Sequence, residues 1–185
     1  MRPNLENSYV ERIDRHREQK DAKPTGGPAE ELVAKFNNTV SGLETRFSTK
    51  EEDKGPEIGG RQTVDLVSYL EKKPALAIQI TTNTEKGVIK KKLEEISQHP
   101  FIRLEEMAKG DTAIPKVLVY LDAQAVRDFA NDPDFSKHPE VALQIIKSYY
   151  NSLKFSLTQT KNPLEQKAIK QLMEMFEQEK KKYLH

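Results

Sequence analysis

The stretch from residue 62 to residue 82, QTVDLVSYLEKKPALAIQITT, decides the fold of this chain. Its first part, residues 62–70, is rich in β-branched and apolar residues and predicts a strand. Residues 71–74, EKKP, predict a turn. Residues 75–82 are apolar at nearly every position, which is typical of a strand buried on both faces in the middle of a sheet. The stretch therefore predicts a central β-hairpin.

Asp65, Gln79 and Thr81 are polar residues within this largely apolar hairpin. Asp65 lies between Val64 and Leu66, where an unpaired carboxylate would be costly. Gln79 and Thr81 are two residues apart in the second strand, so they share one face of the sheet. Carboxylate and amide oxygens suit hard divalent cations, and a bound cation can activate water. The hairpin therefore predicts a small metal site, although isolated polar residues in strands are often only hydrogen-bonded core residues.

Helical periodicity surrounds the hairpin on both sides. Helices are predicted over residues 29–47, 84–98, 123–131, 140–157 and 164–184. Thr84 and Asp122 are placed to cap the second and third of these helices. Residues 116–121, KVLVYL, predict a third strand. The predicted fold class is therefore α/β, with a small central mixed sheet flanked by helices and extra helices at the C-terminal end.

The composition fits one soluble domain with an N-terminal arm. The chain has 185 residues, a net charge of +1 and no cysteine, which excludes disulfide scaffolds, cysteine zinc sites and thiol catalysis. Residues 1–28 are polar and end in KPTGGP, so we expect a flexible arm or a short docked helix. One domain is expected over residues 29–185, with a core at 29–121 and a helical part at 122–185. No stretch approaches about 18 apolar residues and no signal-peptide core is visible, so we expect a cytoplasmic protein without a membrane span.

The order of these elements resembles the core of the PD-(D/E)xK nuclease superfamily, a restriction-endonuclease-like fold. The resemblance covers about residues 29–121 and rests on Val64-Asp65 and Gln79-Ile80-Thr81. It implies a metal-dependent endonuclease that hydrolyses phosphodiester bonds, with DNA as the first expected substrate. It also implies that Asp65 and Gln79 hold Mg²⁺ or Mn²⁺.

Two departures from the family pattern bear on activity. Gln79 stands where the family has an acid, but its carbonyl oxygen can still bind a metal. Thr81 stands where the family has a Lys that polarises the attacking water, and a hydroxyl brings no positive charge. Lys92 falls on the apolar stripe of the predicted helix 84–98, and its long stem can reach the sheet. We therefore expect Lys92 to supply the missing charge, or the activity to be lost.

Further charged residues complete the predicted site. The family often adds a Glu from the first helix, and the candidates are Glu30 and Glu44, of which Glu44 lies closer to the buried edge of the stripe. Lys86, Lys90 and Lys91 form a local basic group that can meet a phosphate backbone, although such a group is more often a solvated helix face.

Two alternatives to a working nuclease remain open. One is a catalytically inactive nuclease-like domain that binds nucleic acid or protein, which both departures and the near-neutral charge favour. The other is a helical interaction protein, because the two C-terminal helices carry apolar stripes of the kind found at partner surfaces. The same stripes predict a homodimer through the C-terminal helices.

Overall fold

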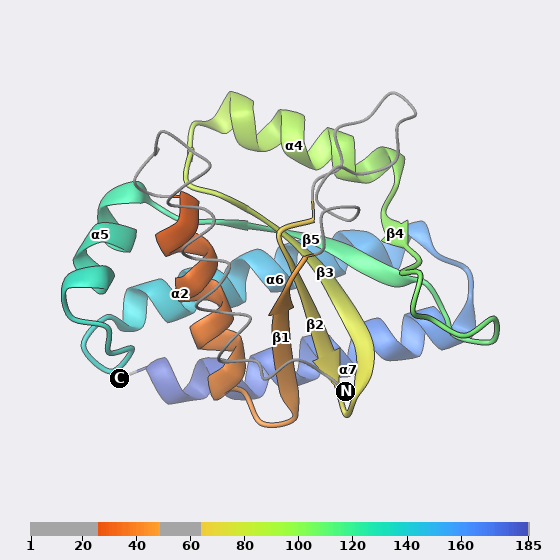
Figure 1. Cartoon of the computed structure of the whole chain (residues 1–185). Helices are drawn as coiled ribbons and strands as arrows, with labels where there is room; N and C mark the ends of the chain where they lie inside the picture. Colours follow the sequence, from red (N-terminus) through yellow and green to blue (C-terminus); the bar gives the residue numbers. More distant parts are fainter. Residues whose placement is uncertain (1–25, 49–63, 185) are drawn as a thin grey trace.

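A computed structural model describes residues 26–48 and 64–184 and contains one mixed sheet with the strand order β1-β2-β3-β5-β4. Helix α4 runs along one side of this sheet, and α7 runs along the opposite side (Figure 1). The strands are β1 (Leu43–Phe47), β2 (Leu66–Leu70), β3 (Lys73–Thr81), β4 (Phe101–Ile102) and β5 (Ile114–Tyr120). The helices are α2 (Gly26–Thr39), α4 (Lys86–Gln98), α5 (Ala123–Asn131), α6 (Pro139–Gln159), α7 (Pro163–Lys180) and the short 3-10 helix η1 (Lys181–Tyr183). The predicted α/β class is confirmed.

The sheet is built around the predicted hairpin. Strands β1, β2 and β3 form an antiparallel meander, in which Leu66 pairs with Ile78. Strand β5 pairs in parallel with β3, and α4 lies in the connection between them. The two residues of the hairpin turn, Glu71 and Lys72, have φ values of 50° and 70°. Positive φ at both positions is what a type I′ turn needs, because that backbone twist matches the twist of the strands.

The first helix is shorter than its apolar periodicity predicted. It begins at Gly26 rather than residue 29 and ends at Thr39. Gly42 adopts φ +83°, which reverses the chain and starts strand β1. The prediction of one helix through Phe47 is therefore wrong, because alternate residues of β1 continue the buried stripe begun by the helix.

The boundaries of the other helices lie close to the predicted ones. Asp122 caps α5 by accepting a hydrogen bond from the Ala125 N–H at 3.0 Å, as predicted. Thr84 does not cap α4, whose N-cap residue is Glu85. The apolar stripe of α7 packs into the core of the same chain, through Ile169 and Phe176 among others, so these residues are not available to a second copy. Within residues 26–48 and 64–184, no helix is long and apolar enough to cross a membrane.

The two faces of the sheet carry cores of different size. The larger core joins Leu66, Ile78 and Val119 to apolar residues from α2, α5, α6 and α7. The smaller core, on residues such as Val67 and Ala77, is closed by side chains from the loop between β4 and β5. Asp65, Gln79 and Thr81 belong to neither apolar cluster, which leaves polar groups at one end of the central strands.

Helix α6 seals the edge of the sheet along β5. Strand β4 pairs only with the first two residues of β5, at Ile114 and Pro115. Further along, the backbone N–H of Leu118 donates to Ser152 Oγ at 3.1 Å, and that of Tyr120 donates to Ser148 Oγ at 3.4 Å. Side-chain hydroxyls therefore take the hydrogen bonds that another strand would otherwise accept.

A buried chain of hydrogen bonds ties α6, α2, β2 and β1 together. Tyr149 donates its hydroxyl to Asn37 Oδ1 at 2.8 Å, and Asn37 Nδ2 donates to Ser68 Oγ at 3.3 Å. Ser68 Oγ also lies 2.7 Å from Thr45 Oγ1. All four residues are 0% exposed, and burial raises the pKa of Tyr149 far above its ordinary value, so its hydroxyl stays a donor. This hydrogen-bond network fixes the helices and strands in one register, because a buried polar group that lost its partner here could not bond to water instead.

Removing the Tyr149 hydroxyl should destabilise the fold. Tyr149→Phe leaves the Asn37 Oδ1 acceptor buried without its donor, so we expect the free energy of unfolding to fall by about 1–3 kcal/mol. Urea denaturation followed by circular dichroism measures this loss. Tyr150→Phe is the control, because Tyr150 is only half-buried; equal stabilities of the two variants would contradict the role of the network.

Relieving the hairpin turn should stabilise the fold. Lys72→Gly places a residue that tolerates positive φ at the φ 70° position, so we expect a gain of about 0.5–1 kcal/mol in the free energy of unfolding. Lys73→Gly, one residue later in β3, should lose stability because glycine is unfavourable within a strand. A loss in both variants, measured by thermal unfolding, would show that the turn is not strained.

Candidate functional site

Asp65 lies at the end of the hairpin, one residue before β2. Its N–H donates to the Ile78 carbonyl at 2.8 Å, and its Oδ2 accepts from the Ile80 N–H at 2.7 Å. Its carbonyl accepts from the Ser48 N–H at 3.0 Å, which links it to the end of β1. The carboxylate thus occupies a place in the ladder that a backbone carbonyl would normally fill.

Gln79 is the closest of the predicted partners of Asp65 in register. The ladder ends at the pair Leu66–Ile78, and beyond it Asp65 is hydrogen-bonded to the backbone of Ile78 and Ile80, the two residues that flank Gln79. Gln79 is half-buried, as Asp65 is. The hairpin therefore brings Asp65 to the stretch of β3 that contains Gln79, and a metal site formed by the two side chains stays a prediction.

Thr81 has a role in the turn that follows β3. Its Oγ1 accepts from the Asn83 N–H at 3.2 Å, and its carbonyl accepts from the Leu121 N–H at 3.0 Å. The side chain is 8% exposed. These contacts close the turn and join the ends of β3 and β5, which is a structural task that a Lys at this position could not perform with its side chain.

Glu44 is wrongly predicted as a ligand beside Asp65. It lies on β1 and not on a helix, is exposed, and pairs with Tyr69 in register. Tyr69 is four residues along β2 from Asp65, which corresponds to about 13 Å of strand. The cause is the chain reversal at Gly42, which turns the predicted end of the helix into a strand.

Glu30, the other candidate, lies on α2 at the level of Asp65. The two elements run antiparallel (Figure 1), and Thr45 N–H donates to Asn38 Oδ1 at 3.2 Å near their junction. From there, Glu30 lies eight residues along the helix, about 12 Å. Ser48, which contacts Asp65, lies three residues along the strand, about 10 Å. Glu30 is 5% exposed, and α2 packs on the sheet face of Leu66 and Ile78, so a shared site of Glu30 with Asp65 stays a prediction.

Lys116 is a buried cation that the sequence analysis did not single out. It lies on β5 beside Ala77 in register, and Ala77 shares a sheet face with Gln79. It is 7% exposed, and burial lowers the pKa of its ammonium from 10.5 to about 8. Within residues 26–48 and 64–184, no hydrogen bond or ion pair engages this ammonium. The sequence places Lys116 at the start of the predicted strand 116–121, and it lies inside a strand only because β5 begins at Ile114.

Lys92 has the position that its spacing predicted. It is half-buried and lies on the side of α4 that carries the buried Ile96. In the described part of the chain it takes part in no hydrogen bond or ion pair. Its role as the source of positive charge therefore stays a prediction, with Lys116 as a second and more deeply buried candidate.

The remaining predicted lysines lie on the outer part of α4. Lys86 and Lys90 line an open groove between α4 and α6, and Lys91 is exposed. Their contact with a phosphate backbone stays a prediction.

A second polar cluster, Arg46, Tyr69 and Glu106, closes the smaller core. Arg46 Nε donates to the Tyr69 hydroxyl at 2.8 Å, and its guanidinium pairs with Glu106 at 2.9 Å. The Tyr69 hydroxyl donates to Glu106 as well, and burial followed by this hydrogen bond raises the pKa of Tyr69. The Arg46 guanidinium is therefore already bound to Tyr69 and Glu106. The cluster joins β1, β2 and a distant loop, so no local spacing in the sequence could have predicted it.

The donor chemistry at the end of the sheet fits Mg²⁺ better than a transition metal. Asp65, Glu30 and Gln79 offer only oxygen, and Mg²⁺ binds through one or two carboxylates while keeping several waters. Among residues 26–48 and 64–184, no group of three or more His, Cys, Asp or Glu side chains is arranged to hold a metal. A cation here would therefore depend on the Gln79 carbonyl and on water.

Comparison with known proteins adds no assignment. No protein-family model matches the chain, and no match was found among curated proteins or among solved structures.

The buried Lys116 should make stability depend on pH. Its pKa is lower in the folded chain than in the unfolded chain, so between pH 8 and 10.5 the unfolded chain binds more protons. The free energy of unfolding should therefore rise with pH across this window. Lys116→Met should lack that rise and should be about 1–3 kcal/mol more stable than the unaltered chain at neutral pH.

Urea denaturation at a series of pH values tests this expectation. Lys73→Met is the matched control, because Lys73 lies exposed on β3 and should keep the pH dependence of the parent chain. A Lys116→Met variant with an unchanged pH profile would show that Lys116 is solvated in the folded state.

Proposed function

We propose that this chain is a metal-dependent nuclease of the PD-(D/E)xK kind that hydrolyses phosphodiester bonds, with DNA as its first substrate. The observation that carries the proposal is that Asp65, at the end of the central hairpin, is hydrogen-bonded to the backbone of Ile78 and Ile80 on either side of Gln79. The order of helix, hairpin, helix and parallel strand around this pair supports it. The buried Glu30 carboxylate is the third oxygen ligand of the proposal, in place of Glu44.

The metal, Asp65 and a buried ammonium have separate roles in the proposed reaction. Bound Mg²⁺ or Mn²⁺ supplies an activated water and neutralises charge on the phosphate. Asp65 is held by the Ile80 N–H at 2.7 Å, so its carboxylate is positioned before any ligand binds. Hydrolysis adds this water across a P–O bond of the backbone, and negative charge grows on the phosphate oxygens. An ammonium held in a buried place stabilises that charge strongly, because little water screens it.

Lys116 is the proposed source of this ammonium. Thr81 cannot provide it, and the Arg46 guanidinium is committed to Tyr69 and Glu106. Lys116 lies on the face that carries Gln79 and is buried without a partner in the described part of the chain, so a phosphate would supply its missing counter-charge. Keeping it costs stability, which is typical of residues retained for function.

A second candidate is a catalytically inactive nuclease-like domain that binds nucleic acid or protein. The observation that favours it is the use of Thr81 to close a turn and of Asp65 to complete the strand ladder. Both tasks are structural and need no metal.

The test is incubation of the full chain with labelled single-stranded DNA, double-stranded DNA and RNA, with Mg²⁺ or Mn²⁺ and with EDTA. We expect metal-dependent cleavage that falls by at least about 10²-fold in Asp65→Asn, whose amide oxygen can still accept from the Ile80 N–H. Glu44→Gln is the matched control and should keep full activity, because Glu44 is exposed and distant along the strand.

Two lysine variants separate the sources of charge. Lys116→Met should lower the cleavage rate while raising stability, and Lys92→Met should have the smaller effect on cleavage. The reverse order would assign the charge to Lys92. No cleavage of any substrate, with nucleic-acid binding that is the same in Asp65→Asn, would overturn the nuclease proposal in favour of the inactive domain.

A further inference from the structure

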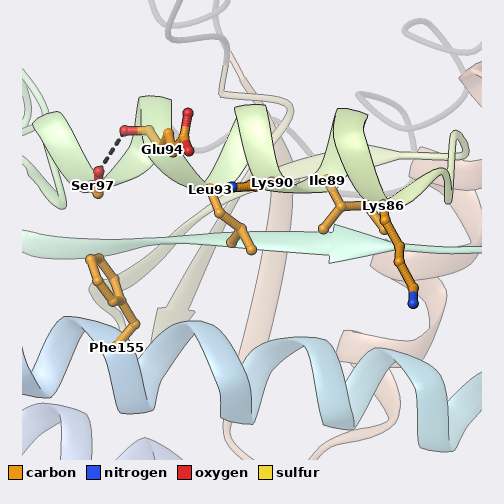
Figure 2. Close-up of a pocket in the computed structure, with 7 residues that line it drawn as sticks. All are labelled: Lys86, Ile89, Lys90, Leu93, Glu94, Ser97 and Phe155. Atoms are coloured by element: carbon orange, nitrogen blue, oxygen red, sulfur yellow. Dashed lines mark hydrogen bonds between the residues drawn. The ribbon is translucent and has the colours of Figure 1, made fainter.

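An open apolar groove runs between α4 and α6, on residues other than the proposed catalytic ones. Its volume is about 460 Å³. Figure 2 shows Leu93 extending from α4 toward α6, and Phe155 extending from α6 toward α4. The groove is lined by Lys86, Ile89, Lys90, Leu93, Glu94, Ser97 and Phe155.

The apolar floor of this groove is exposed to an unusual degree. Leu93 is 40% exposed and Phe155 is 37% exposed, and the described residues contain only two other large apolar side chains with such exposure, Leu164 and Leu184. Single exposed apolar residues are common, but two that face each other across a hollow form a contiguous patch. Such a patch indicates a binding surface.

The charges around the floor are mainly positive. Lys86 and Lys90 lie on the α4 wall, one turn apart, and on α6 the exposed Lys154 directly precedes Phe155, while the exposed Lys147 lies eight residues before it. Within the described part of the chain, none of these four lysines takes part in an ion pair or hydrogen bond. Glu94 is the acidic residue among those that line the groove. A complementary ligand therefore has an apolar centre and acidic flanks.

We propose that this groove binds an acidic amphipathic helix of a partner protein. The lining residues of α4 extend from Lys86 to Ser97, a length of about 16 Å, which matches three turns of helix. An apolar stripe on such a helix covers Leu93 and Phe155, and carboxylates on its flanks meet the lysines. DNA fits less well, because its phosphates would pair with the lysines but leave the aliphatic floor of Ile89 and Leu93 uncovered.

The test uses two fluorescent 18-residue helical peptides with the same leucine stripe. One carries Glu and the other Lys at the positions that flank the stripe. We expect the full chain to bind the Glu peptide at least about tenfold more tightly, since several partly exposed ion pairs add to the shared apolar contact. The double variant Lys86→Glu with Lys90→Glu should reverse this preference, and it changes only exposed side chains.

A second pair of variants tests the floor of the groove. Phe155→Ser should weaken binding of the Glu peptide by about tenfold or more, and Leu164→Ser, an exposed leucine outside the groove, should not. Equal binding of both peptides, or binding of neither, would overturn the proposal. A DNA duplex that displaces the Glu peptide would assign the groove to nucleic acid. A dimer, measured by sedimentation, that dissociates in Phe155→Ser would assign it to a second copy of the chain.

Discussion

The buried chain of hydrogen bonds from Tyr149 through Asn37 and Ser68 to Thr45 holds the rest of the structure in place. In a region without water, each of its polar groups must find its partner, so the elements that carry them have little freedom to slide. The network also bears on the candidate site. It links α2, which carries Glu30, to β2, which follows Asp65 directly. The network thus fixes the position of α2 relative to the strand that follows Asp65.

The candidate site combines structural and chemical tasks in the same residues. Asp65 completes a strand ladder through the Ile80 N–H, and Thr81 closes the turn beyond β3. Lys116, in contrast, destabilises the fold by its burial, and its ammonium makes no hydrogen bond or ion pair in the described part of the chain. A residue that only supports the fold makes its contacts without a ligand, whereas among the described residues the Lys116 ammonium has no polar partner.

Features that depend on local interactions could be predicted from the sequence, and features that depend on distant contacts could not. The hairpin, the parallel strand β5 and the helices after it follow from local periodicity and turn residues, and the structure contains them. Strand β1 was missed because Val40, Leu43 and Phe47 fit a helical stripe as well as they fit a turn followed by an alternating strand. The chain reversal at Gly42 decides between the two, and it also moves Glu44 out of the site.

The parts of the site that could not be predicted depend on distant contacts. Arg46, Tyr69 and Glu106 lie on separate elements, and only the folded chain brings them together. Lys116 was visible as a charge at the start of a predicted strand, but its lack of a partner in the described residues is a property of the packed structure. The two-residue hairpin turn alone would place Asp65 opposite Ile78, and the irregularity between Ser68 and Tyr69 shifts this register by one residue, which spacing in the sequence does not predict.

The serine contacts along β5 also affect how the protein can aggregate. An unpaired strand edge is a template on which other chains can add, and aggregation through such edges begins without unfolding the rest of the protein. Here Ser148 and Ser152 of α6 occupy that edge, and their helix also supplies Ile145 and Leu153 to the core. Exposing the edge therefore requires removal of α6 and loss of the core with it. Self-association through this part of β5 is thus coupled to global unfolding, whereas β1 and the short strand β4 are the edge strands among the described residues.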